Sequence, residues 1–299
     1  MRRFVAPGKA VVLGEYAVLL GAPAVVAAVD RGVACEVTPS PTLRITTPSD
    51  DRFVRPALEA VGAPPAHYHF VDAAPALAQG KVGLGGSAAA TVVACLAGST
   101  LAGRPLTADA LRSMAHDVHH RVQGSGSGID VAAAAHGGVF RWEAGRAVPI
   151  EAPPIRLAYS GSSATTGPRV VAFRAWATAH PDAAARFVAD TVALVQGFHD
   201  DPMGVLDAAG QRLGEMAQEA GIAYWTPGLQ ALVAQTRLHG GGAKPSGAGG
   251  GDVVVAILPH GHVARWQAAV EAEGYPVLPV AIAPGAHELI PEEGAPPAA

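Results

Sequence analysis

Hydrophobic and polar positions follow two different patterns in the first half of the 299-residue chain. Residues 10–38 alternate short β-branched runs with Gly and Pro turns, which predicts a set of antiparallel strands. Residues 87–102 are rich in Ala, Val and Leu after a glycine turn, and apolar positions recur at helical spacing over residues 106–123, so both segments are predicted to be helices. A strand is predicted again at residues 137–142. This half therefore combines a sheet with helices.

The second half shows a similar mixture after a break at residues 152–154 (Ala-Pro-Pro), which predicts a domain boundary. Strands are expected at residues 155–160, 252–258 and 276–282, and helices near residues 169–179, 182–198, 203–220, 227–239 and 262–273. Strands before and after a group of helices predict an α+β sandwich in each half instead of a doubly wound parallel sheet. Residues 1–152 and 153–290 would form two domains, followed by a disordered tail at residues 291–299.

The composition indicates a folded protein with extensive burial. Hydrophobic residues make up 49% of the chain and charged residues 15%, against about 25% charged in typical soluble domains. The net charge of −4 includes no basic block that would follow a phosphate backbone, so nucleic acid is not an expected partner. The apolar stretch at residues 10–29 is interrupted by Glu15 and Pro23, and we expect neither a signal peptide nor a membrane span. Cys35 and Cys95 are expected to be buried thiols of a cytoplasmic protein.

Lysine is rare in this sequence, and its positions point to phosphate chemistry. Of the 21 basic residues only three are lysines, namely Lys9, Lys81 and Lys244. Each of them lies next to a glycine-rich turn. An ammonium is a compact charge that fits between phosphate oxygens where a planar guanidinium does not.

Two glycine-rich turns have the composition of anion sites. The first, at residues 81–90, leads directly into a predicted helix, whose free N–H groups and positive dipole end would face a ligand. At such an anion site Ser87 would cap this helix or reach Mg²⁺. The alternative is that the turn is an ordinary helix N-cap that binds no ligand. The turn lacks the Gly-Lys-Ser/Thr ending of a Walker-type loop. The second turn, at residues 244–252, runs straight into a strand, which favours a phosphate-shaping loop over a flexible linker.

Two further segments place charged side chains beside glycine turns. Lys9, Glu15 and Tyr16 lie in an otherwise apolar strand, and isolated buried charges are costly unless they are paired or used. Asp130 lies where a helix begins after the glycine turn within residues 123–133, a position that the helix dipole alone would favour. The residue pattern alone does not decide between a structural and a catalytic role for Asp130.

Taken in order, these segments resemble the signature motifs of the GHMP kinases, the superfamily of galactokinase, homoserine kinase, mevalonate kinase and phosphomevalonate kinase. Residues 83–89 match the usual Gly-Leu-Gly-Ser-Ser-Ala-Ala motif, with Gly86 in place of the first serine. Ser87 is thus the only serine of this motif that would serve Mg²⁺.

Within the superfamily the chain is most similar to the phosphomevalonate kinases. The likeness is carried by residues 14–19, the Lys-x-Gly-Leu-Gly stretch from Lys81, and residues 126–133, 159–166 and 244–252. Mevalonate kinases more often show Gly-Glu-His in the first motif and an acidic residue at the position of His119. The resemblance therefore favours phosphomevalonate as the phosphoryl acceptor.

The resemblance implies a ribosomal-protein-S5-like N-terminal domain and a ferredoxin-like C-terminal domain, with the active site between them. It implies ATP-dependent phosphorylation of phosphomevalonate to diphosphomevalonate, in the mevalonate route to isoprenoids, by a monomer or homodimer that uses Mg²⁺. The alternatives are a mevalonate kinase or another GHMP small-molecule kinase, then diphosphomevalonate decarboxylase or a non-catalytic sensor with this fold.

The resemblance also implies roles for individual residues. Lys9 and Asp130 would be catalytic, and Ser87 would bind the metal. ATP would be bound by Lys81, Gly83, Leu84, Gly85, Gly86, Ser87 and Ala88, and the acceptor or its phosphate by Glu15, Tyr16, Ser127, Thr165, Thr166, Lys244, Ser246, Gly247, Ala248 and Gly249. An acceptor phosphate is mostly ionised at neutral pH, so Asp130 would orient Lys9 or the metal, whereas a hydroxyl acceptor would require it as a base.

Overall fold

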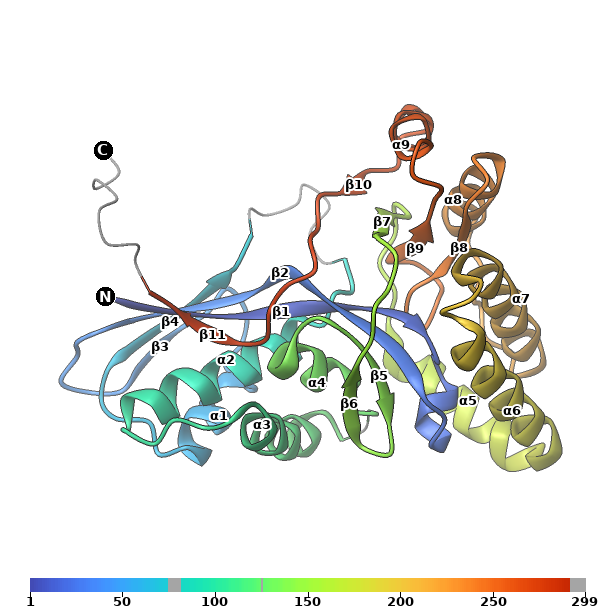
Figure 1. Cartoon of the computed structure of the whole chain (residues 1–299). Coiled ribbons are helices and arrows are strands. Elements are labelled where there is room, and N and C mark those ends of the chain that lie inside the picture. The colour runs from blue at the N-terminus through green and yellow to red at the C-terminus, as the bar shows by residue number, and fades with distance from the viewer. Residues whose placement is uncertain (75–81, 125, 291–299) are drawn as a thin grey trace.

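The computed structural model describes residues 1–74, 82–124 and 126–290, which form two sheets accompanied by helices (Figure 1). The first sheet contains seven strands: five follow the order β11-β1-β2-β4-β3, while β5 pairs with β2 and β6 pairs with β5. The second sheet contains four strands in the order β10-β7-β9-β8. Each half of the described chain thus has the α+β architecture that the sequence predicts.

The centre of the first sheet is the antiparallel pair β1 (Arg2–Leu13) and β2 (Ala24–Thr38), joined through the short 3₁₀ helix η1 (Ala17–Leu20). Small and β-branched side chains fill most positions of both strands, which suits a largely covered sheet. The remaining strands are β3 (Arg44–Thr46), β4 (His67–Asp72), β5 (Val139–Glu143), β6 (Arg146–Pro149) and β11 (His287–Leu289). The prediction of antiparallel strands within residues 10–38 is confirmed, although they are two long strands.

A close backbone approach fixes β1 against the glycine turn that precedes helix α2 (Gly86–Leu101). Gly8 has no room for a side chain, because a Cβ there would lie 2.1 Å from the carbonyl oxygen of Arg31 and 2.7 Å from that of Leu84. The next residue, Lys9, donates its backbone N–H to the same Leu84 oxygen over 2.9 Å. Gly8 therefore sets the position of Lys9 relative to residues 83–85.

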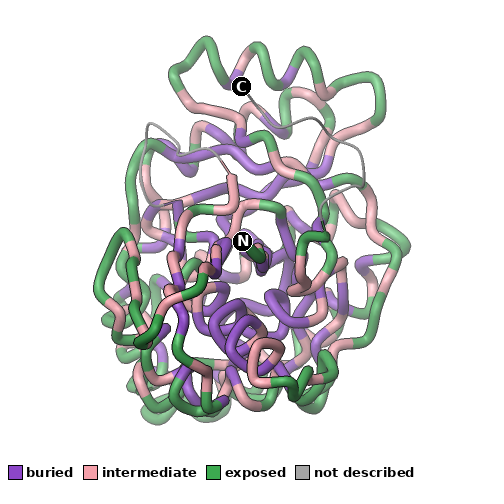
Figure 2. Tube along the Cα trace, turned by 90° about the vertical axis from the view of Figure 1, so that its left-hand side faces the viewer, coloured by how far each residue is buried: buried purple, intermediate pink, exposed green. Residues whose placement is uncertain are grey.

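Four helices cover one face of the first sheet, namely α1 (Val54–Ala60), α2, α3 (Ala108–Gln123) and α4 (Ile129–His136) (Figure 1). Helix α2 is buried at most of its positions, and its Val92 and Val93 pack with Phe4 and Phe70 of the sheet. Figure 2 shows this buried interior inside a shell of exposed residues. The helices predicted at residues 87–102 and 106–123 are confirmed as α2 and α3, whereas the sequence pattern does not predict α1.

The second sheet consists of β7 (Ile155–Tyr159), β8 (Gly242–Pro245), β9 (Val253–Ile257) and β10 (Val277–Leu278). Its helices are α5 (Thr166–Ala179), α6 (Pro181–Gly197), α7 (Pro202–Glu219), α8 (Pro227–Leu238) and α9 (Val263–Ala272). All five helices begin and end within three residues of the predicted bounds. The sequence pattern does not predict β8, because its glycine-rich surroundings resemble a loop, and the strand predicted at residues 276–282 is limited to β10.

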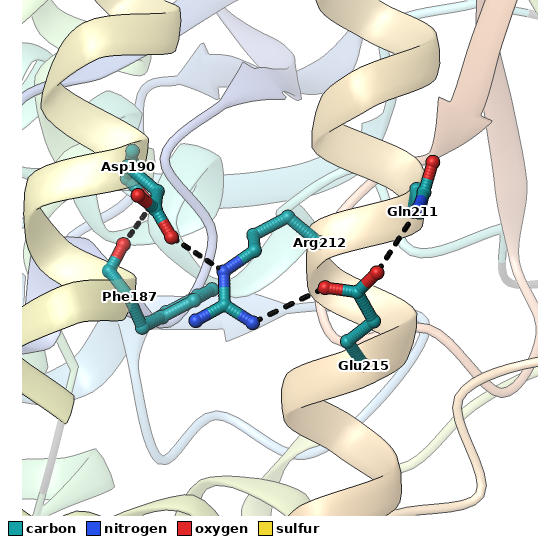
Figure 3. A network of polar contacts seen from close by, with 6 residues as sticks. Phe187, Asp190, Gln211, Arg212 and Glu215 are labelled. Carbon is teal, nitrogen blue, oxygen red and sulfur yellow. Dashed lines mark hydrogen bonds and ion pairs between the residues drawn. The ribbon is translucent and has the colours of Figure 1, made fainter. Parts of the chain in front are cut away.

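A charged network joins α6 and α7 (Figure 3). Arg212 of α7 donates through Nε to Asp190 of α6 over 2.7 Å and through a terminal nitrogen to Glu215 over 3.3 Å, and its guanidinium lies over the Phe187 ring. Both carboxylates are about half exposed, so each ion pair contributes at most about 1 kcal/mol. The network chiefly orients two helices whose inner side chains pack against Leu13 at the end of β1.

The last described strand returns to the first sheet. Strand β11 pairs antiparallel with β1, with Arg3 opposite Leu289. The final part of the expected second domain, residues 153–290, thus lies against the first. The predicted tail at residues 291–299 lies outside the described residues. Among the helices of the described ranges, none has the length and apolar character needed to cross a membrane.

Replacement of Gly8 by alanine is expected to lower the free energy of unfolding by about 1–3 kcal/mol, because the added Cβ overlaps two carbonyl oxygens in a well-packed sheet. The matched control is Gly261→Ala, where a Cβ would meet no atom within 4 Å. Urea unfolding followed by far-UV circular dichroism measures both changes. Equal stability of the two variants would contradict this role of Gly8.

Candidate active site

The side chains of Lys9 and Asp130 lie beside the same glycine. Lys9 comes from β1 and donates through Nζ to the carbonyl oxygen of Gly83 over 3.3 Å, whereas Asp130 comes from the first turn of α4. A Cβ on Gly85 would lie 3.1 Å from Cγ of Lys9 and 3.7 Å from Cβ of Asp130. The structure therefore places the side chains of Lys9 and Asp130, which the sequence has in separate motifs, on either side of one glycine.

The glycine turn before α2 leaves the beginning of this helix open to an anion. Gly83 and Gly85 have φ angles of +72° and +79°, and Gly85 caps α2 without a side-chain hydrogen bond. The positive end of the helix dipole and its first N–H groups thus lie beside Lys9. Leu84 and Ala88 are buried, whereas Gly83 and Gly86 are the exposed positions of this turn. Lys81, expected to bind ATP, lies outside the described residues.

Ser87 at the start of α2 meets a buried histidine of α3. Its Oγ lies 3.2 Å from Nε2 of His119, whose ring stacks on Phe53 with centroids 5.0 Å apart. Burial lowers the pKa of His119 below its ordinary value, against the opposing effect of Asp130, which favours a neutral imidazole. Ser127, half-buried, precedes α4 in the same region. A small cavity beside Asp130 is lined by His116, His119, His120, Gln123, Gly126 and Gly128.

Oxygen donors for a Mg²⁺ ion are present at this turn. Ser87 supplies a hydroxyl and Asp130 a carboxylate, both of the hard type that Mg²⁺ prefers. Within residues 1–74, 82–124 and 126–290, no group of three or more His, Cys, Asp or Glu side chains is placed to hold a metal by itself. The donor set suits a magnesium ion that is bound by one or two protein oxygens together with nucleotide phosphates.

The second glycine-rich loop is held by residues at the end of β1. Lys244 is fully buried, and its ammonium donates to Oε1 of Glu15, which is also buried. Burial lowers the pKa of Lys244, and Glu15 raises it. The same Glu15 oxygen accepts the backbone N–H of Gly247 over 3.2 Å. Both charged residues were expected to bind the acceptor or its phosphate, whereas here they bind one another.

Tyr16 and Ser246 add neutral contacts to the same junction. The Tyr16 hydroxyl donates to the carbonyl oxygen of Ala248 over 2.7 Å, and burial raises the pKa of this phenol well above its ordinary value. Ser246 Oγ accepts the backbone N–H of Val11 over 2.9 Å and donates to the carbonyl oxygen of Val11 over 3.0 Å. The loop of residues 246–249 is therefore connected directly to the strand that carries Lys9.

Asp252, which ends the glycine-rich motif but is not among the predicted site residues, also belongs to this region. A Cβ on Gly83 would lie 2.4 Å from its Oδ2, and its Oδ1 accepts the backbone N–H of Ala164 over 3.2 Å. Burial raises the pKa of Asp252, while the Ala164 N–H, Lys9 and Arg169 lower it. Its φ of +59° is rare for a residue other than glycine, and this backbone conformation is the signal that marks it.

Arg169 brings a second cation to the glycine-rich loop. It lies in the first turns of α5, where Thr165 and Thr166 are exposed, and it donates to the carbonyl oxygen of Thr165 over 2.7 Å. Its Nε is buried and has no hydrogen-bond partner among the described residues. A Cβ on Gly250 would lie 1.9 Å from a terminal nitrogen of the guanidinium, so the loop and this arginine are in close contact.

Two family models match this chain, "GHMP kinases N terminal domain" over residues 52–138 and "GHMP kinases C terminal" over residues 195–276. A mevalonate kinase from Methanothermobacter thermautotrophicus is 30% identical over 278 residues, covering 85% of this chain and 89% of that protein. A phosphomevalonate kinase from Streptomyces sp. is 28% identical, covering 85% and 88%. The crystal structure of a Lin0012 protein from Listeria innocua superposes with a TM-score of 0.85 at 22% identity, covering 96% and 99%.

The two-domain α+β fold and the matches to both family models identify a small-molecule kinase of the GHMP class. The chain belongs to the GHMP kinases, and it is an ATP-dependent phosphotransferase of that superfamily. The predicted superfamily and fold are thereby confirmed. Most of the similar proteins are named mevalonate kinase, so the relatives do not single out the predicted likeness to phosphomevalonate kinase.

The structure separates two kinds of glycine in the second loop. Gly247→Ala and Gly249→Ala both place alanine at positive φ, but a Cβ at Gly249 would lie 2.2 Å from the Tyr224 ring, whereas at Gly247 it would meet no atom within 4 Å. We expect Gly249→Ala to lower the free energy of unfolding by about 2–4 kcal/mol and Gly247→Ala by about 1 kcal/mol. Urea unfolding compares them, and a Gly249 variant as stable as the Gly247 variant would contradict the ring contact.

Proposed function

We propose that this chain transfers the γ-phosphoryl group of ATP to the phosphate of phosphomevalonate, forming diphosphomevalonate and ADP. The observation that carries the choice of acceptor is Arg169, whose buried Nε lacks a partner among the described residues and lies beside the glycine-rich loop. A guanidinium binds phosphate through two parallel hydrogen bonds, and a reaction between two phosphates requires cations on the acceptor side. A shared region is supported by contacts: Lys9 donates to the carbonyl oxygen of Gly83, a Cβ on Gly83 would meet Asp252, and a Cβ on Gly250 would meet Arg169.

The proposed transfer would use these groups as follows. An oxygen of the acceptor phosphate forms a bond to the γ-phosphorus, while the bond from this phosphorus to the β–γ bridging oxygen breaks and ADP leaves. Negative charge develops on the equatorial oxygens, where the Lys9 ammonium would stabilise it. Asp130, across Gly85 from Lys9, would orient that ammonium or the metal. The acceptor phosphate has a second pKa of about 6 and needs no general base at neutral pH.

The binding roles are assigned by segment. The backbone of residues 83–88 and the beginning of α2 would hold the triphosphate, together with Lys81. Mg²⁺, when bound near Ser87, would neutralise charge on the β- and γ-phosphates. Residues 246–249 with Tyr16, Ser127, Thr165 and Thr166 would enclose the acceptor, although the enclosed ammonium of Lys244 faces Glu15 instead of the exterior.

Mevalonate is the second candidate acceptor, because mevalonate kinase is the name that most of the similar proteins carry. Its nucleophile is an alcohol, so Asp130 would have to accept a proton during transfer. An arginine with an unpaired buried nitrogen would then bind only the carboxylate of the acceptor. This candidate leaves the ATP site as described and changes the roles of Asp130 and Arg169.

Product identification decides between the two acceptors. Purified protein is incubated with ATP, Mg²⁺ and, separately, mevalonate, phosphomevalonate or diphosphomevalonate. We expect phosphomevalonate to be converted with a kcat/KM at least about a hundredfold above that for mevalonate, a difference of roughly 2.7 kcal/mol. Conversion of mevalonate without conversion of phosphomevalonate would overturn the acceptor and leave the kinase fold and ATP site in place.

Replacement of Arg169 by lysine tests the proposed phosphate contact. Lysine keeps the charge but loses the bidentate geometry, so we expect the KM for phosphomevalonate to rise at least about tenfold while the KM for ATP stays near its original value. The control is Arg174→Lys, an exposed position on the same helix. A rise in the KM for ATP alone would place Arg169 on the nucleotide side.

A further inference from the structure

Glu15 and Lys244 form a buried ion pair between the two halves of the molecule. Glu15 follows the end of β1, Lys244 lies on β8, and their side chains are 3% and 0% exposed. The family resemblance implies that both bind the acceptor or its phosphate, whereas in the structure each is enclosed by protein and neutralised by the other. A different role is therefore required for two residues of the signature motifs.

The ion pair holds the backbone of the glycine-rich loop. Glu15 Oε1 accepts the N–H of Gly247 over 3.2 Å, and Lys244 Nζ donates to the carbonyl oxygen of Pro245 over 2.8 Å. These contacts connect both neighbours of Ser246 to the end of β1. A buried ion pair adds little net stability, because desolvation offsets the attraction between the charges. Its geometry, rather than its strength, is what the loop depends on.

The surroundings make each charge dependent on the other. Glu15 Oε2 is buried without a hydrogen-bond partner among the described residues, and the small cavity beside it is lined mainly by apolar side chains of β1, α6 and α7. Removal of Lys244 would leave a lone buried carboxylate, and removal of Glu15 would leave a lone buried ammonium. Either change is expected to displace the loop, since a lone charge moves toward water or loses its ionisation.

We propose that Glu15 and Lys244 are positioning residues that set the place of the loop at residues 246–249 relative to Lys9, and that they touch neither nucleotide nor acceptor. The inference rests on the proposed function in one respect, namely that this loop contacts a phosphate during the reaction. It differs from direct phosphate binding in a measurable way. A neutral pair of the same shape would preserve the loop, but it would abolish a contact between ammonium and phosphate.

The test is a double-mutant cycle of Glu15→Gln, Lys244→Met and the variant with both changes. Glutamine keeps an oxygen that accepts the Gly247 N–H, and methionine keeps the length of the lysine stem but gives up the bond to the Pro245 carbonyl oxygen. We expect each single variant to lose about a hundredfold in kcat, and the double variant to return to within about tenfold of the original kcat and KM values. Activity is measured with whichever acceptor the original protein converts, so a wrong acceptor assignment does not affect the outcome.

The double variant alone decides the case if the single variants fail to fold. A folded double variant that remains more than about tenfold impaired in kcat would show that an ammonium at residue 244 acts on substrate, and would overturn the proposal. A double variant that does not fold would also overturn it, because a neutral pair of this shape is predicted to keep the loop in place. The exposed pair Arg2 and Glu288, changed in the same way, serves as the control, and neither its single variants nor its double variant should lose activity.

Discussion

A buried charge requires a partner, and this constraint decides how the two halves of the molecule meet. Strand β1 and the residues that follow it bring the half-buried Lys9 and the buried Glu15 and Tyr16 to this junction, and each of them finds its contacts on another segment. Lys9 reaches the turn before α2, while Glu15 and Tyr16 reach the loop after β8. One strand thus positions both glycine-rich segments, and the site lies where its polar residues are satisfied.

The sequence predicts those parts of the fold that depend on local pattern. Helices α2 and α3 are long, strongly apolar or periodic, and follow clear turns, so their positions are apparent from the order of residues alone. Strand β8 escapes prediction because four residues within a glycine-rich stretch carry too little pattern. Its pairing with β9 and its packing under α7 give it a conformation that local sequence does not specify.

The site residues also divide into those that the local sequence predicts and those that only the folded structure brings together. Lys9, Ser87 and Asp130 stand out because each lies at a glycine turn with its own signature. The pairing of Lys244 with Glu15 is not predictable in this way, since it joins residues 229 positions apart and either could equally have met a ligand. The roles of Arg169 and Asp252 are inferred from the groups that surround them in the folded chain, and those groups come from separate elements. The family motifs therefore specify the nucleotide side better than the acceptor side.

Strand β11 affects how this chain can fold. Residues 287–289 complete one edge of the first sheet, so the edge of β1 stays unpaired until nearly the whole described chain is available. During synthesis from the N-terminus, the half that carries Lys9 would have an unpaired strand edge until β11 is made. Such an edge can pair wrongly with another chain. Pairing between distant segments also slows folding compared with proteins built from local contacts. The first sheet of this kinase is therefore complete only when the end of the second half has folded against it, so the two halves depend on each other for folding as well as for the active site.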